Sequence, residues 1–346
     1  WLEIAPHVRY GFSLNQLQSK LKTTYKMGDK NLVIEGGRYV YQINPDEPIL
    51  PIINSLTTLM LESNYMKIYQ KEFASIKYHH KITDKYRLTA SADYANRLPL
   101  ENQTNHTWFN KSDQDYSPNA PTNVEMGNTQ FPEHQIFTTG LSLTMKPWQK
   151  YYIKNKEQQA VNHSSPEITL AYDNALPVND TEISYHKWSA DITHALDVGI
   201  RGRLSFRMGG GGFLAKDSIT FLDYNHFMGN RTPIQDIDVV KSFRLLPYYN
   251  YSTDGAYFNL LTHYQFRKLF FSRFNFARKR GVKESVFVNY LGTHSSLNYT
   301  EAGYSIDNIF RLFRLEAVAA FHDGEYVDWG IRFGVAAFLE EMFNFE

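Results

Sequence analysis

The chain has 346 residues, of which 53 are aromatic (24 Tyr, 24 Phe and 5 Trp), and its 36 Lys and Arg balance its 36 Asp and Glu. A net charge of zero removes the long-range positive field of a nucleic-acid-binding protein, so we expect no nucleic-acid partner. The lack of Cys excludes a disulfide scaffold, an iron–sulfur protein and a thiolate zinc site. The longest nearly apolar stretch, Pro48–Leu61, is too short to span a membrane as a helix.

Alternation with a period of two recurs along the chain. Between Lys85 and Arg97, apolar side chains such as Tyr86 and Leu88 occupy the even positions, and polar side chains occupy the odd ones. Successive side chains of a strand point to opposite faces, so this pattern predicts strands with one apolar and one polar face. The same pattern occurs at Val8–Leu14, Leu17–Met27, Leu32–Ile43, Phe73–Ile82, Gln135–Met145, Glu167–Asn174, Trp188–Val198, Ile200–Met208, Ala256–Phe266, Lys283–Leu291, Phe313–Phe321 and Trp329–Val335.

The length of these runs favours a membrane β-barrel. Runs of about 9 to 13 residues match tilted membrane strands and exceed the usual strand of soluble domains. We therefore expect an all-β, transmembrane antiparallel barrel of about 16 strands, forming one domain over residues 1–346. The polar stretches Leu98–Glu133 and Ala215–Val240 predict long loops on one rim, and Ile53–Tyr69 is the one segment with helical character. A soluble all-β sandwich gives the same alternation and remains an alternative.

Charged residues on the polar faces are the first candidate site. Arg201, Arg203 and Arg207 would lie on one face of one strand, where every second residue is about 7 Å further along. If that face lines a lumen, it needs water or acidic partners from other strands. Either a salt-bridged wall or a guide for anionic cargo fits this pattern. The lumen-facing candidates are Arg201, Arg203, Arg207, Asp93, Glu316 and Arg332, with Asp173, Asp191 and Glu301 as further acidic partners.

No motif points to catalysis, a cofactor or a metal. Gly209–Gly212 lacks the Gly-Lys-Ser/Thr that opens the helix of a phosphate loop, so we expect these glycines to end a strand and admit another backbone closely. There is no His-Glu-x-x-His and no Gly-x-Ser-x-Gly. The prediction is a protein that is not an enzyme and holds neither cofactor nor metal.

Several segments together resemble a known family. They are Tyr224–Thr232, Phe243–Tyr249, Tyr299–Gly303, Asn308–Glu316 and Trp329–Gly334. They are similar to an uncharacterised family of Bacteroidetes outer-membrane barrels that follow a carboxypeptidase-regulatory-like domain. This resemblance implies a location in the bacterial outer membrane, contact with its lipid, and a regulatory-like domain before Trp1. The name of that domain does not imply peptidase activity.

A more distant likeness concerns the assembly and secretion barrels of bacterial outer membranes. In that superfamily an arginine on an inward-folding loop meets an acidic residue of the barrel wall. The likeness carries over to Gly229 and Arg231, with Asn230 between them, as candidate anchors of an inward loop. The family's Arg-Gly-aromatic order is absent here. The last strand is expected to end near Phe338, and the chain runs on to Phe345 and Glu346 instead of closing on a terminal aromatic residue of that strand.

These observations lead to one functional expectation with two alternatives. We expect an outer-membrane barrel that acts in export, assembly or surface display of proteins or lipids, with protein partners in an envelope complex. A passive structural subunit of such a complex is the first alternative. A soluble all-β binding protein is the second.

Overall fold

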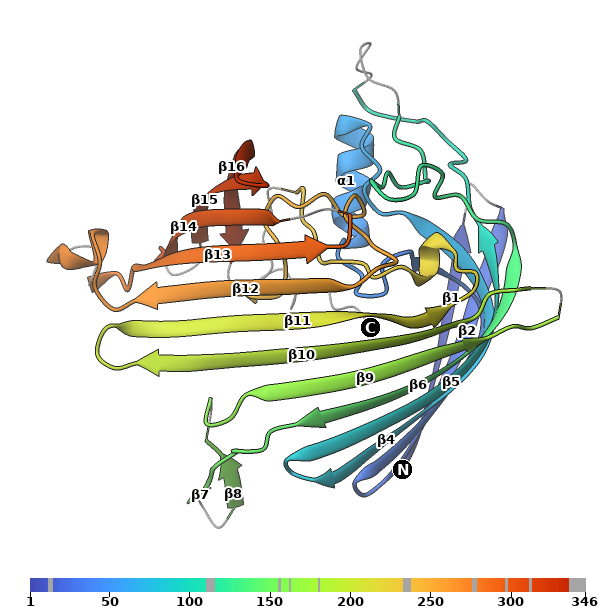
Figure 1. Cartoon of the computed structure of the whole chain (residues 1–346), viewed down its shortest axis with the longest axis horizontal. Helices are drawn as coiled ribbons and strands as arrows, with labels where there is room; N and C mark the ends of the chain where they lie inside the picture. The colour runs from blue at the N-terminus through green and yellow to red at the C-terminus, as the bar shows by residue number, and fades with distance from the viewer. Residues whose placement is uncertain are drawn as a thin grey trace.

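The computed structural model describes residues 1–11, 15–109, 116–154, 157–161, 163–179, 181–232, 238–275, 279–295, 298–310 and 313–335. In this part of the chain, fourteen antiparallel strands form one sheet, ordered as in the sequence from β1 to β16, and β7 and β8 form a separate hairpin. Figure 1 shows the sheet as strongly curved, running from β1–β5 at the right to β13–β16 at the upper left. The architecture is therefore all-β, as expected.

The strands of the large sheet are long. They are β1 (Leu2–Gly11), β2 (Gln16–Met27), β3 (Lys30–Gln42), β4 (Ile68–Thr83), β5 (Tyr86–Pro99), β6 (His134–Met145), β9 (Glu167–Leu176), β10 (Tyr185–Val198), β11 (Gly202–Lys216), β12 (Tyr257–Phe266), β13 (Lys283–Thr293), β14 (Tyr299–Ile309), β15 (Phe313–His322) and β16 (Glu325–Val335). The hairpin comprises β7 (Tyr151–Lys154) and β8 (Glu157–Ala160). The short helices are α1 (Pro51–Leu61), η1 (Phe221–Asp223) and η2 (Phe271–Arg273).

The register divides the sheet into two faces of opposite character. Directly paired residues of antiparallel strands share a face, so the pairs Asn289↔Glu301 and Glu316↔Arg332 place these four side chains on one polar face. The other face, here called the outward face, carries large apolar side chains that are exposed. They include Leu21, Tyr25, Ile34, Ile76, Tyr94, Leu141, Leu170, Tyr172, Trp188, Phe258, Val288, Trp329, Ile331 and Phe333.

The three longest connections emerge at the same end of the strands, here called the long-loop end. They are residues 43–67, which include α1, residues 100–133, and residues 217–256. Consecutive antiparallel strands turn at alternate ends, so the tight turns at 28–29, 84–85 and 199–201 lie at the opposite end. That end also carries the longer connections 146–166 and 267–282.

Helix α1 begins and ends through local backbone chemistry. Pro51 occupies the first helical turn, where its missing N–H costs nothing. The helix stops at Glu62, whose backbone has the left-handed conformation (φ 58°) and whose N–H donates to the carbonyl of Thr58. No helix in the described residues is long and apolar enough to cross a membrane.

The structure differs from the expected arrangement in four places. The large sheet has 14 strands in the described residues, against the expected count of about 16, and β7 and β8 pair only with each other. The expected helix is confirmed as α1, but Ile68 and Tyr69 already belong to β4. Arg201 lies in the turn before β11 and not on that strand, and Gly209–Gly212 lie within β11 instead of at its end. The expected strand end near Phe338 lies outside the described residues.

Candidate functional site

The candidate site is the connection between β11 and β12, whose described residues 217–232 and 238–256 are here called the interior loop. Its side chains and backbone contact the polar face on strands far apart in the sheet order, from β5 to β16. Many of its aromatic residues are buried although no regular strand holds them, including Phe221, Tyr224, Phe227, Phe243, Tyr248 and Tyr249. The polar face is therefore the concave, filled side of the curved sheet.

The first attachment of the interior loop is an ion pair with β5. Arg97 Nη1 lies 2.7 Å from Asp223 Oδ1, and their side chains are only 12% and 1% exposed. The hydroxyl and N–H of Thr220 donate to Oδ2 of Asp223, so the same carboxylate caps η1. Burial alone would raise the pKa of Asp223, but Arg97 and the Thr220 hydrogen bonds lower it overall, which keeps the carboxylate charged.

Strand β10 supports the same attachment. Tyr185 donates from its hydroxyl to Asp223 Oδ1 at 3.3 Å. The ammonium of Lys187 donates to the carbonyls of Asp223 and Tyr224 at 3.2 and 3.3 Å. The beginning of the interior loop is thus held by charged and polar groups of two strands, β5 and β10.

The second attachment joins the interior loop to β14 and β15. The backbone N–H of Arg244 donates to Glu301 Oε2 at 2.7 Å, and those of Leu245 and Leu246 donate to Oε1 at 2.7 and 3.0 Å. Tyr299 and Asn289 donate to the same carboxylate. Glu301 is fully buried. A buried carboxylate with this many donors fixes the loop backbone against the sheet.

Arg244 points into the sheet beside this carboxylate. Its Nε lies 3.3 Å from Glu316 Oε2, with side-chain exposures of 1% and 0%. Its guanidinium also donates to the carbonyls of Ser242 and Val239 and lies 4.8 Å from the ring centre of Phe287. The charge is therefore paired, hydrogen-bonded and stacked, which is what burial of a guanidinium requires.

Arg332 adds a third attachment from β16. Its Nη1 donates to the carbonyl of Asn230 at 3.1 Å and to that of Arg244, and the residue is 2% exposed. Two distant parts of the interior loop therefore meet on one side chain of the last described strand. Gly229 lies here because a Cβ would come within 2.5 Å of the Leu246 carbonyl oxygen.

The inward-loop candidates predicted from the sequence belong to the interior loop, and the charged candidates belong mostly to the sheet. Gly229, Asn230 and Arg231 all belong to the interior loop. Arg231 Nη1 lies 3.0 Å from Asp328 of β16, but the two side chains are 41% and 44% exposed. Its role as an anchor stays a prediction.

The charged candidates on the polar face lie mostly in ion pairs. They pair as Arg203 with Asp197, Arg207 with Asp191, Asp93 with Lys71 and Glu316 with Arg244. Arg332 is bound to loop carbonyls, and Arg201 lies in the turn between β10 and β11. Of the candidates, Glu316, Glu301 and Arg332 contact the buried Arg244, and Asn230 shares the guanidinium of Arg332 with it.

Sequence reasoning missed the most buried contacts. Arg244 belongs to the segment Phe243–Tyr249, and the only signal was a single cation inside an apolar run. Asp223 and Arg97 carry no motif at all, because the ion pair joins residues 126 positions apart. Such pairs depend on the curvature of the sheet and not on local spacing.

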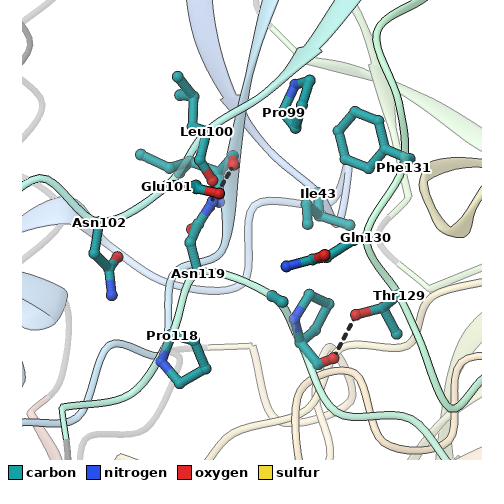
Figure 2. Close-up of a pocket in the computed structure, with 13 residues that line it drawn as sticks. Ile43, Pro99, Leu100, Glu101, Asn102, Pro118, Asn119, Thr129, Gln130 and Phe131 are labelled. Atoms are coloured by element: carbon teal, nitrogen blue, oxygen red, sulfur yellow. Dashed lines mark hydrogen bonds between the residues drawn. The ribbon is translucent and has the colours of Figure 1, made fainter.

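The long-loop end also contains a cavity of about 360 Å³ (Figure 2). Asn119 lies in its wall, and its amide donates to the carbonyls of Ile68 and Leu100, both at 2.7 Å. Thr129 donates to the carbonyl of Pro121 at 2.6 Å. Glu101 is the one ionisable residue of its lining. These polar groups hold the loops together, and the wall offers no set of groups for catalysis.

The described residues contain no group of three His, Asp or Glu placed to bind a metal ion. Together the geometry defines an all-β protein with a curved antiparallel sheet, an exposed apolar outward face and a concave polar face occupied by one loop. The sequence matches, over residues 1–306, the model described as the family of unknown function (DUF5686) C-terminal domain. The chain therefore belongs to that family.

Three solved structures are among those similar to this chain. BamA from Haemophilus ducreyi lacking POTRA domains 1–3 has a TM-score of 0.48 and 10% identity, with 92% of this chain and 62% of that chain covered. The Pseudomonas putida toluene transporter TodX has a TM-score of 0.25 and 8% identity, with 93% of this chain and 81% of that chain covered. The monoaromatic hydrocarbon channel CymD has a TM-score of 0.25 and 10% identity, with 96% of this chain and 84% of that chain covered. The chain thus spans less than two thirds of the BamA structure. No curated protein matches the sequence.

Proposed function

We propose that this protein is an integral β-barrel of the bacterial outer membrane and that its interior loop occludes the lumen. The observation that carries the proposal is the contrast between the two faces of the sheet. Exposed Leu141, Leu170 and Trp188 are costly in water but suited to lipid. In hydrocarbon every backbone group needs a partner, so the proposal requires the edges at β1 and β16 to be closed in the membrane.

The loop lengths support an orientation. Bacterial outer-membrane barrels have short periplasmic turns and longer extracellular loops. In the proposed orientation, the long-loop end with α1 and the cavity of Figure 2 faces the cell exterior, and the end with the tight turns faces the periplasm. The outward face would contact lipid along the whole height of the strands.

The proposed role is non-enzymatic work in an envelope complex that exports, assembles or displays proteins or lipids. The interior loop supports this role because charged groups, which are reversible attachments, hold it to β5, β10 and β14–β16. The alternative role is that of a passive structural subunit. The burial of Arg244 and Glu316 favours it, because a loop fixed this firmly closes the lumen permanently.

The pairing of the strand arginines bears on the cargo. Arg203 and Arg207 of β11 each lie within 3.2 Å of an aspartate of β10. Neutralised arginines support a salt-bridged wall more than a guide for anionic cargo. The proposal therefore assigns transport to movement of the interior loop and not to a row of arginines.

Membrane fractionation of cells that express the full chain tests the location. We expect the protein in the outer-membrane fraction, extracted only by detergent. Release without detergent would contradict the membrane proposal and favour a soluble binding protein.

Affinity purification of the detergent-extracted protein, followed by mass spectrometry, identifies the partners.

Single-channel conductance tests the role of the interior loop. We expect the wild type to be closed and the double variant Arg97→Ala/Arg244→Ala to open, because it loses both ion-pair attachments. Arg231→Ala is the matched control, since its ion pair is exposed. Silence of the double variant, with its fold verified by circular dichroism, would favour the passive subunit.

A further inference from the structure

The connection between β12 and β13 lies at the end of the strands opposite the long-loop end and is the most basic connection there. Seven of the seventeen residues from Arg267 to Lys283 are Lys or Arg, and none is Asp or Glu. The described part, residues 267–275 and 279–282, is here called the basic rim loop. Arg267, Lys268, Arg273, Lys279 and Arg280 are exposed. None of them forms an ion pair with another described residue.

Glu284 directs the basic rim loop toward the outward face. In the register, Glu284 pairs with Phe266 and Ile306, which places its side chain on the outward face. Its carboxylate accepts a hydrogen bond from the hydroxyl of Tyr304, a residue of the same face. The carboxylate accepts the backbone N–H groups of Phe270, Phe271 and Ser272 at 2.8 to 3.1 Å. The loop therefore folds over the outside of the sheet, away from the interior loop.

Exposed aromatic rings accompany the cations. Phe270 and Phe274 are 64% and 52% exposed, and their ring centres lie 6.3 Å apart. Fully hydrated phenyl rings are unfavourable in water. Basic side chains beside exposed rings are the composition of a segment that lies at the headgroup level of a bilayer.

Two neighbouring turns extend the same surface. The N–H of Arg267 donates to the carbonyl of Arg201 at 2.9 Å, which brings the turn with the 85% exposed Ile200 alongside. The guanidinium of Arg280 lies 5.8 Å from the ring centre of Phe310 in the β14–β15 connection, and Phe310 is 68% exposed. Three connections at one end of the strands thus present apolar and cationic groups together.

We propose that the basic rim loop binds the phosphate groups of anionic phospholipid headgroups in the leaflet at that end of the barrel. This inference rests on the proposed membrane location. Arg273, Lys279 and Arg280 supply the charge, and Phe270 and Phe274 enter the boundary between headgroups and acyl chains. Glu284 holds the loop at the height where both contacts form together.

Native mass spectrometry of the full chain in detergent, titrated with phosphatidylglycerol or phosphatidylcholine, tests the inference. We expect the wild type to bind phosphatidylglycerol about tenfold more tightly. The variant Arg273→Gln/Lys279→Gln/Arg280→Gln should lose this preference. The matched control Lys30→Gln/Lys150→Gln/Lys154→Gln removes three exposed cations at the same end outside the loop and should keep it.

A second variant separates the apolar contact from the charge. Phe270→Ser/Phe274→Ser should weaken the binding of both lipids by a similar factor and keep the preference for phosphatidylglycerol. Circular dichroism verifies that each variant is folded, and Arg267→Gln/Lys268→Gln replaces the triple variant if that one does not fold.

Three outcomes would overturn the inference. They are an undiminished preference in the charge variant, an equal loss in the control, and displacement of phosphatidylglycerol by equimolar inorganic phosphate. All three leave the membrane location intact. A chain that is soluble without detergent would instead overturn the proposed function together with this inference.

Discussion

Arg231 and Arg244 lie on the same interior loop but in opposite environments. Arg231 faces Asp328 in an ion pair that is more than 40% exposed, where solvent weakens the attraction. Arg244 is 1% exposed, against the buried Glu316 and the ring of Phe287. The buried arginine therefore carries far more of the attachment than the arginine in the Gly229–Arg231 segment.

Replacing each arginine by alanine should separate the two. We expect Arg244→Ala to lower the free energy of unfolding by about 3 to 5 kcal/mol, because it removes one partner of a buried ion pair. Arg231→Ala should cost about 1 kcal/mol or less. Denaturant titration in detergent micelles measures both. Equal effects of the two substitutions would contradict the assignment of the principal attachment to Arg244.

His226 should make the interior loop sensitive to acid. Its ring contacts those of Phe221 and Tyr249, at 5.2 and 6.0 Å between ring centres, and Nδ1 lies 2.8 Å from Ser252 Oγ. Burial lowers the pKa of His226 to about 3, and the nearby Lys187 acts in the same direction. The folded protein therefore holds this imidazole neutral at neutral pH.

The sign of the effect follows from proton linkage. Between about pH 3 and 6.5 the unfolded chain binds a proton at His226 that the folded chain does not, so stability falls as the pH falls. The contribution is complete above about pH 6.5 and decreases by about 1.4 kcal/mol per pH unit below it. Unfolding measured at pH 7 and pH 5 should show a smaller loss in His226→Gln than in the wild type. Identical losses would refute the prediction.

At the scale of single elements, β11 shows how glycine sets the distance between strands. A Cβ on Gly211 would lie 2.5 Å from the Trp188 carbonyl oxygen on β10 and 3.0 Å from the Tyr257 ring on β12. A Cβ on Gly210 would lie 3.3 Å from the Tyr257 carbonyl oxygen. The two neighbouring glycines are therefore under different steric demands.

Alanine at each position tests this difference. We expect Gly211→Ala to cost about 1 to 3 kcal/mol, because β10 or β12 has to move. Gly210→Ala should cost clearly less, because a shift of a few tenths of an ångström relieves its contact. Thermal unfolding in the same detergent compares the two, and a larger effect at Gly210 would disprove the explanation.

Much of the element order could be predicted from the sequence. The alternation at Lys85–Arg97 and Gln135–Met145 corresponds to β5 and β6, because a strand with two different surroundings needs a two-residue period. Close approach of another backbone at Gly209–Gly212 is confirmed at Gly211. The continuation of β11 beyond these glycines could not be predicted, because pairing with β10 and β12 outweighs the weak intrinsic strand preference of glycine.

The site itself was less predictable. Glu316 and Arg332 were selected as charged residues of polar faces, and both contact the interior loop. Their common partner Arg244 was not selected, because alternation describes strands and carries no information on how a loop folds back. The Arg97–Asp223 pair has the same origin, since only the curved sheet brings β5 and η1 together.

At the scale of the whole molecule, the interior loop and the sheet curvature support each other. The loop is attached to β5 and β10 on one side and to β14, β15 and β16 on the other. A flat sheet would hold these strands too far apart for one connection to fill the space between them. Phe243 and Leu246 of the loop are buried in one cluster with Phe287 of β13. The loop residues that fill the concave side therefore also stabilise the curvature.

The environment of the outward face is the property on which the proposed function depends, and one substitution probes it. Leu141 of β6 is 51% exposed on that face, and its neighbour Ser142 lies on the polar face. In a bilayer, Leu141→Arg should cost about 2 to 4 kcal/mol, because a cation would face hydrocarbon. In a soluble protein the same exposed position should change stability by about 0.5 kcal/mol or less. Unfolding by urea in phospholipid vesicles measures the effect, and Ser142→Arg is the control for the added bulk and charge. A Leu141→Arg variant as stable as the wild type would contradict the placement of this face in lipid.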